Sequence, residues 1–184
     1  MKQGMFFVLA LLATVIPACG GLNAPVYETV VPAEIQPGNA VPAPTNEVVL
    51  TLSGNITASN SDGLLELDLP TLEKFGLVQY TVTDPWFQDD VTYTGILLAD
   101  LIEVAAPPDP VTAVTVTALD GYSADIPLAE IQRWPVLLAT RANDQHLTIA
   151  NNGPTRIIFP YDAHQDVTAA RNMSVWNIEF LEIK

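Results

Sequence analysis

The stretch NNGPTRIIFP, residues 151–160, places Arg156 between a Gly-Pro turn and the apolar run of Ile157, Ile158 and Phe159. The apolar run predicts a buried strand. Arginine is rarely buried unless it is paired, so the side chain of Arg156 either reaches the surface or meets an anion. The identity of that anion is the main functional question that this sequence raises.

The composition restricts the class of protein. The chain has 184 residues, of which 49% are hydrophobic and 15% charged, and this suits one globular domain with a substantial core. The formal net charge is -14, from 21 acidic and 7 basic residues. Because this charge repels phosphate backbones, we expect no nucleic acid among the partners.

The N-terminus predicts export. An apolar run from Met5 to Ile16 is too short to span a bilayer, so residues 1–18 are interpreted as a signal peptide. Ala18 precedes Cys19, the only cysteine of the chain, and this arrangement resembles a bacterial lipobox, in which the cysteine is lipidated. The alternative is an ordinary secretory signal that is cut near Ala18 and leaves a free cysteine.

Lipidation of Cys19 would anchor the protein outside the cytoplasm, to a bacterial membrane facing the periplasm or at the cell surface. Residues 19–46 are proline-rich and show no helical or strand period, so we expect a disordered tether without a strand. The folded domain is then predicted at 47–184. With no cysteine there, it has no disulfide and no thiolate metal ligand.

Strands outnumber helices in the domain, which predicts a mixed, strand-rich α+β fold. The expected strands are 48–52, 78–83, 91–94, 111–119, 122–126, 136–141, 147–149, 155–159 and 175–183. The expected helices are 70–75, 95–106 and 127–132.

No strong local catalytic motif is present, and the weaker candidates leave alternatives open. Asp162, His164 and Asp166 alternate and would hold a divalent cation on an extended segment, whereas a solvated loop would leave them unconnected. Arginines are concentrated in the C-terminal part, at positions 133, 141, 156 and 171. They predict a local site for phosphate or carboxylate, unless each arginine pairs with an acidic residue of the chain.

Several segments together resemble one family. Gly153-Pro154-x-Arg156 with Pro160, followed by Ser174-Val175-Trp176-x-Ile178, is similar to the C-terminal pattern of the oxidoreductase molybdopterin-binding domain, the sulfite-oxidase-like superfamily. The middle of the chain agrees with this pattern at Trp86, at 93–102 and at the hairpin 114–126. The resemblance runs from about residue 48 to the C-terminus.

The resemblance implies an α+β fold with a molybdenum-carrying pterin in a pocket lined by loops. Enzymes of the family ligate the metal through one cysteine just before the tryptophan segment, but here residues 81–86 contain none. One interpretation is a non-catalytic binding or accessory module. The alternative is a molybdopterin-dependent oxidoreductase in which Asp84 replaces the sulfur, with Arg141 and Arg156 on the pterin phosphate or the substrate oxyanion.

The sequence does not decide between these two interpretations, so whether the protein is an enzyme stays open. The residues assigned to cofactor binding are Asp84, Trp86, Arg141 and Arg156, and no residue is assigned as a metal ligand. Molybdopterin is implied by the resemblance alone. The partners predicted are the membrane, through the lipid on Cys19, and a small anionic ligand or a partner protein.

Overall fold

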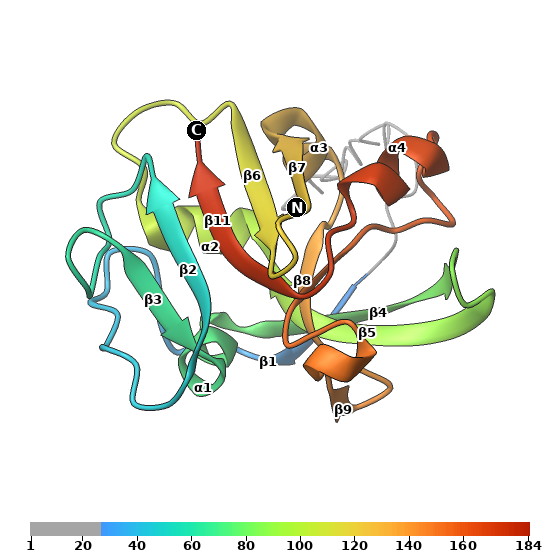
Figure 1. The fold of residues 1–184 in the computed structure, drawn as a ribbon, viewed down its shortest axis with the longest axis horizontal. Helices are drawn as coiled ribbons and strands as arrows, with labels where there is room; N and C mark the ends of the chain where they lie inside the picture. The colour runs from blue at the N-terminus through green and yellow to red at the C-terminus, as the bar shows by residue number, and fades with distance from the viewer. Residues whose placement is uncertain (1–26) are drawn as a thin grey trace, which may run out of the picture.

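Two sheets form most of the fold within residues 27–184, the part of the chain that this computed structural model describes (Figure 1). The predicted signal peptide (1–18), Cys19 and the first part of the predicted tether (19–26) lie outside the described residues. The first sheet has the strand order β1-β4-β5-β8-β10, and β9 pairs with β8. Its strands are β1 (Glu28–Val31), β4 (Leu77–Asp84), β5 (Asp89–Leu97), β8 (Leu137–Ala142), β9 (Gln145–His146) and β10 (Arg156–Ile158).

The second sheet has the order β3-β2-β11-β6-β7, in which β2 and β11 are parallel and the other neighbours antiparallel. Its strands are β2 (Val48–Gly54), β3 (Leu65–Asp68), β6 (Ala113–Ala118), β7 (Ser123–Pro127) and β11 (Ile178–Ile183). The helices are α1 (Leu69–Leu72), α2 (Leu98–Ala105), α3 (Leu128–Arg133) and α4 (Val167–Met173), with 3₁₀ turns at Glu73–Phe75 and Ile149–Asn151. No helix in this part of the chain is long and apolar enough to cross a membrane.

The strand period of β4 brings a charged residue into the core. Side chains of a strand alternate between its two faces, and in β4 Tyr80, Val82 and Asp84 are buried whereas Thr81 and Thr83 are exposed. One hydrophobic cluster draws on both sheets and on α2, and Tyr80 and Val82 belong to it. Asp84 is therefore held at the end of β4, on the face that carries the core.

The predicted α+β, strand-rich fold class is confirmed, with three local differences. The strand expected at 147–149 is wrong, because β9 ends at His146 and a 3₁₀ turn begins at Ile149. The helix expected over 95–106 begins at Leu98, because residues 95–97 continue β5 against β8. Gly95 allows this close pairing, since a Cβ there would lie 2.1 Å from the carbonyl oxygen of Leu138. Helix α4 was not expected. The Asp166 side chain begins it by accepting from the backbone N–H of Ala169 (2.9 Å).

The predicted tether is wrong for residues 28–46. Strand β1 pairs with β4 at the edge of the first sheet, where the open side of β4 supplies backbone partners. Ile35 and Val41 are buried in the core cluster, and the Asp68 carboxylate accepts from the backbone N–H groups of Thr45 and Asn46 (2.9 and 3.0 Å). These residues belong to the domain, so its boundary is not at 47.

Candidate functional site

Arg156 forms a buried ion pair with Asp84. The Nη2 atom of Arg156 lies 2.9 Å from Oδ2 of Asp84, and the two side chains are 1% and 0% exposed. Asp84 is the last residue of β4 and Arg156 is the first residue of β10, so the pair joins two strands of the first sheet that are not neighbours. The anion that the sequence requires for Arg156 is thus a carboxylate of the chain itself.

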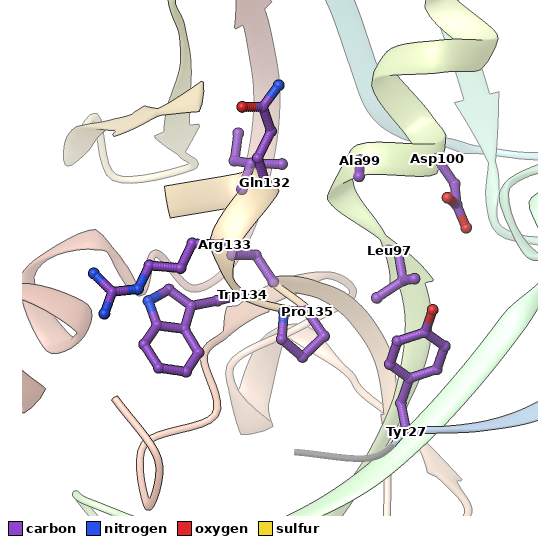
Figure 2. Close-up of a pocket in the computed structure, with 10 residues that line it drawn as sticks. Tyr27, Leu97, Ala99, Asp100, Gln132, Arg133, Trp134 and Pro135 are labelled. Atoms are coloured by element: carbon purple, nitrogen blue, oxygen red, sulfur yellow. The ribbon is translucent and has the colours of Figure 1, made fainter. Parts of the chain in front are cut away.

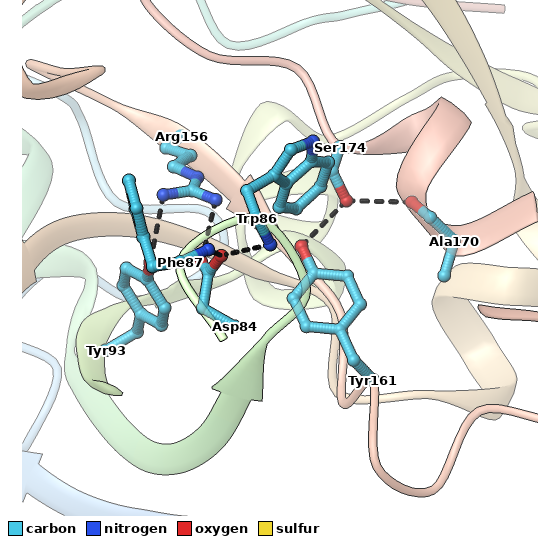
Figure 3. Close-up of polar contacts among 8 residues, drawn as sticks. All are labelled: Asp84, Trp86, Phe87, Tyr93, Arg156, Tyr161, Ala170 and Ser174. Atoms are coloured by element: carbon cyan, nitrogen blue, oxygen red, sulfur yellow. Dashed lines mark hydrogen bonds and ion pairs between the residues drawn. The ribbon is translucent and has the colours of Figure 1, made fainter. Parts of the chain in front are cut away.

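Both oxygens of the Asp84 carboxylate are occupied (Figure 3). Oδ1 accepts from the backbone N–H groups of Trp86 (2.9 Å) and Phe87 (3.1 Å), which fixes the turn that follows β4. Oδ2 accepts from the hydroxyl of Tyr93 (2.7 Å) in addition to Arg156. The carboxylate is consequently satisfied by four donors of the protein.

Tyr93 completes the buried polar cluster. Its hydroxyl donates to Asp84 and accepts from Nη1 of Arg156 (2.9 Å). Burial raises the pKa of Tyr93 well above its usual value, the charge of Arg156 opposes this, and the hydrogen bond to Asp84 adds to it. The phenol therefore stays protonated at neutral pH and serves as a donor.

Aromatic rings enclose the Arg156 guanidinium. Its Cζ lies 4.6 Å from the ring centroid of Trp176, 5.3 Å from those of Trp86 and Tyr93, and 5.7 Å from that of Phe87. These distances are within cation–π range. Within residues 27–184, Nε of Arg156 has no hydrogen-bond partner, so the aromatic faces are its immediate environment. Little room remains beside the ion pair.

A cavity of about 280 Å³ is lined by two of these rings, those of Trp86 and Trp176, and we call it the Trp86 pocket. Its lining includes Trp86, Asp120, Tyr122, Arg171, Ser174 and Trp176. The Arg171 guanidinium lies 5.3 Å from the Trp86 ring centroid. The Trp86 and Trp176 rings meet edge to face, with centroids 5.0 Å apart. Trp86 thus contacts Arg156 and also forms a wall of the pocket.

Tyr161 lies behind the pocket and contacts Ser174, which lines it. The Tyr161 hydroxyl and Ser174 Oγ are 2.8 Å apart, and Oγ donates to the carbonyl oxygen of Ala170 in α4 (2.7 Å) (Figure 3). Burial raises the pKa of Tyr161 to about 12. Tyr161 also packs edge to face against Trp86, with ring centroids 5.8 Å apart. These contacts fix α4 and the Trp86 ring relative to each other.

Arg141 is not part of this site. It lies on β8 and forms a bidentate ion pair with Glu73, with Nη2–Oε2 at 2.6 Å and Nε–Oε1 at 3.1 Å. Thr140 Oγ1 and His146 Nε2 also contact the Glu73 carboxylate. Burial raises the pKa of Glu73, but the hydrogen bonds from Arg141 and Thr140 outweigh this and lower it overall. The structure brings together Asp84, Trp86 and Arg156, but not Arg141.

A second cavity, of about 310 Å³, lies between α2 and α3 (Figure 2). Leu97 and Pro135 contribute apolar surface, and Asp100, whose pKa is raised by burial and by the nearby Glu103, lines it as well. The Arg133 side chain points away from Leu97 and Asp100 and stacks over the Trp134 ring at 5.1 Å (Figure 2). None of the residues assigned to cofactor binding lines this cavity.

The side chains of Asp162, His164 and Asp166, considered as a cation site or as parts of a loop, do not converge on one point. Asp162 accepts from the backbone N–H of Thr83 (3.0 Å), His164 Nε2 lies 2.9 Å from Glu130, and Asp166 caps α4. The three side chains turn to different partners because the segment is not an extended strand. Among the residues described, no three His, Cys, Asp or Glu side chains are grouped to hold a metal ion.

The fold and this site define a two-sheet α+β domain with a buried Asp84–Arg156 ion pair beside a small pocket. Comparison with known proteins gives its family. The family of the oxidoreductase molybdopterin binding domain matches residues 70–165, which is just over half of the chain. The chain belongs to this family.

Among solved structures, the chain is similar to the sulfane dehydrogenase SoxCD from Paracoccus pantotrophus, with a TM-score of 0.56 and 18% sequence identity. The match covers 73% of this chain and 37% of that one, so this chain spans well under half of the SoxCD chain. At this level of identity the likeness shows the fold. Among curated proteins, no relative matches.

The residues around Asp84 do not fit a molybdenum-carrying pterin. The chain from residue 27 onward contains no cysteine, and the carboxylate that stands in the expected ligand segment has both oxygens occupied by protein donors. Carboxylate is also a harder donor than the thiolate that such a centre uses. The space next to the ion pair is filled by aromatic rings.

Sequence reasoning missed several residues of this region, among them Asp120, which was noted only as part of a turn. Tyr93 and Trp176 lie in the motifs that carry the family resemblance, but nothing in the motifs predicts their contact with Arg156. Arg171 was noted only as one of four arginines, and Tyr122 only as a residue of a hairpin. Their common pocket depends on where α4 lies, and this helix was not expected.

Proposed function

We propose that this protein is a lipid-anchored, extracytoplasmic member of its family that has no molybdenum centre and works as a binding or accessory module. One observation carries the proposal that no molybdenum centre is present: the carboxylate of Asp84 is buried and accepts four hydrogen bonds from the protein, one of them from Arg156. An oxygen that is already saturated in this way is a poor metal ligand.

The alternative, an oxidoreductase with Asp84 as the metal ligand, requires Asp84 to leave Arg156. The guanidinium would then remain buried among aromatic rings without a counter-charge. Breaking a buried ion pair on one side costs about 3–5 kcal/mol. Metal binding would first have to supply that free energy, and this favours the structural role of Asp84.

The proposed anchor rests on the sequence around Cys19. If Cys19 carries the lipid, residues 20–27 are the only ones between it and β1, which begins at Glu28. Eight residues span at most about 30 Å when fully extended. The domain would then work close to the membrane surface.

Metal analysis tests the missing redox centre. The full chain is expressed in a host that makes molybdopterin, and molybdenum and released pterin are measured per protein, with an endogenous molybdoenzyme of the same host as positive control. We expect both at background in this protein and near one per chain in the control. A near-stoichiometric content of either in this protein would overturn the proposal.

Labelling tests the anchor. Cells that produce the full chain are fed a clickable fatty acid, and the labelled protein is compared with a Cys19→Ser variant. We expect the label in the membrane fraction of the parent and none on the variant. An unlabelled parent protein that is cleaved near Ala18 would show an ordinary secretory signal instead.

A further inference from the structure

The Trp86 pocket is lined by two opposite charges that do not meet. Arg171 reaches it from α4 and Asp120 from the turn between β6 and β7. Within residues 27–184, neither side chain has an ion-pair partner within 4.0 Å. In a chain with a net charge of -14, an arginine without a carboxylate partner is notable.

Local contacts keep the two charges in place. The Asp120 carboxylate accepts from the backbone N–H of Tyr122 (2.9 Å), and the Arg171 guanidinium lies over the Trp86 ring. The Tyr122 hydroxyl donates to the carbonyl oxygen of Asn172 (2.9 Å) and so joins the turn to α4. The separation between the two charges is thus built into the fold.

The rest of the lining adds recognition groups. The Trp86 and Trp176 rings offer aromatic surface that attracts ammonium groups and packs against short aliphatic chains. Nε1 of Trp176 is buried behind the ring and has no hydrogen-bond partner among the described residues, so this ring contributes aromatic surface and no donor to the pocket. The pocket therefore combines an arginine, a carboxylate and aromatic surface within about 280 Å³.

We propose that the Trp86 pocket binds a small zwitterion of the amino-acid type, with its carboxylate at Arg171 and its ammonium group at Asp120. A plain anion would meet repulsion from Asp120, and a plain cation would meet repulsion from Arg171. A zwitterion satisfies both, and a carboxylate can accept two parallel hydrogen bonds from the guanidinium. The zwitterion proposal rests on the proposed binding function. It specifies the chemical class of the small anionic ligand that the sequence predicts.

Four compounds with a four-carbon chain provide a matched test. L-2-aminobutyrate and 4-aminobutyrate are zwitterions, whereas butyrate carries only the negative charge and butylamine only the positive one. Binding to the full chain is measured by calorimetry and by the tryptophan fluorescence of the pocket. We expect saturable binding of at least one zwitterion, and binding of butyrate and butylamine weaker by at least about tenfold.

Variants locate the site. Arg171→Gln and Asp120→Asn are each expected to weaken zwitterion binding by about tenfold or more, and Arg133→Gln, which changes an exposed arginine outside the pocket, is expected to have no effect. Thermal melting identifies any variant that fails to fold. Because both sites are exposed, we expect the melting temperatures to stay near that of the parent.

Three results would overturn the zwitterion site. One is that no zwitterion binds; another is that butyrate binds as tightly as the zwitterions and Asp120→Asn does not weaken it. The third is that the loss of melting temperature in the double variant Asp120→Asn/Arg171→Gln differs from the sum of the two single losses, which would mean that Arg171 and Asp120 pair with each other. Molybdenum in the same preparation would instead overturn the proposed function, so the two failures are distinguishable.

Discussion

Replacing Arg156 by methionine tests the buried ion pair directly. The variant loses the contact with Asp84 and the hydrogen bond to Tyr93, and it leaves a carboxylate that is 0% exposed without a counter-charge. Removal of one partner of a buried pair costs about 3–5 kcal/mol. The variant also removes the unpaired Nε of Arg156, and this offsets about 1 kcal/mol of the loss in unfolding free energy. We therefore expect a loss of about 3 kcal/mol in the free energy of unfolding.

Urea unfolding, followed by tryptophan fluorescence, measures this loss. With a slope of about 2 kcal/mol/M, the unfolding midpoint should fall by about 1.5 M. Arg133→Met is the matched control, because Arg133 stacks on the Trp134 ring and makes no ion pair in the described part of the chain. Its cost should stay within about 0.5 kcal/mol.

Two further variants separate charge from packing. Arg156→Lys keeps the charge but loses the planar fork that reaches both Asp84 and Tyr93, so we expect a stability between those of the parent and the methionine variant. In the double variant Asp84→Asn/Arg156→Met, the loss should be smaller than the sum of the single losses by about 2 kcal/mol. If Arg156→Met unfolded at the same urea concentration as the Arg133→Met control, the reasoning about the pair would be refuted.

Three other predictions concern the scaffold. Gly95→Ala should cost about 3 kcal/mol in urea unfolding, because its Cβ would collide with the backbone of β8, and a parent-like midpoint would contradict that register. Hydrogen bonds, chiefly from Thr71, lower the pKa of Asp68 against the opposing effect of burial, so the stability that its carboxylate contributes is complete above about pH 5 and decreases as the pH falls. In Asp68→Asn the urea midpoint should therefore decrease less between pH 6 and pH 3 than in the parent. An equal decrease in both proteins would exclude this role. Arg141→Met should lower the free energy of unfolding by only about 1 kcal/mol, because the ion pair with Glu73 is partly exposed. The tryptophan fluorescence of the folded protein should not change, and a change would show that Arg141 is connected to the site.

The sequence predicts elements well where the hydrophobic period is clear. The alternation along β4 and the apolar spacing of α2 both follow from local patterns, and the structure has these elements within a few residues of the predicted bounds. Strand β1 could not be found in this way, because all four of its residues are exposed and its backbone partners come from β4. Such an edge strand is stabilised by its neighbour, which a local pattern does not reveal.

The site was predicted in part, for a related reason. A charge at the start of an apolar strand singled out Arg156, and the family resemblance singled out Asp84 and Trp86. Arg141 was grouped with them because it is also an arginine in the C-terminal part, but on β8 it points to Glu73. Asp84 and Arg156 are 72 residues apart, so their pairing is a property of the sheet order.

Asp84 connects the buried core with the wall of the Trp86 pocket. It neutralises Arg156 in the interior, and its other oxygen fixes the turn that carries Trp86. Trp86 in turn covers Arg156 on one side and forms a wall of the pocket on the other. A carboxylate that must do both cannot also be released to a metal without loosening the pocket wall. Loss of Asp84 should therefore impair stability and ligand binding together, whereas loss of Arg171, which lies outside the buried cluster, should impair binding alone.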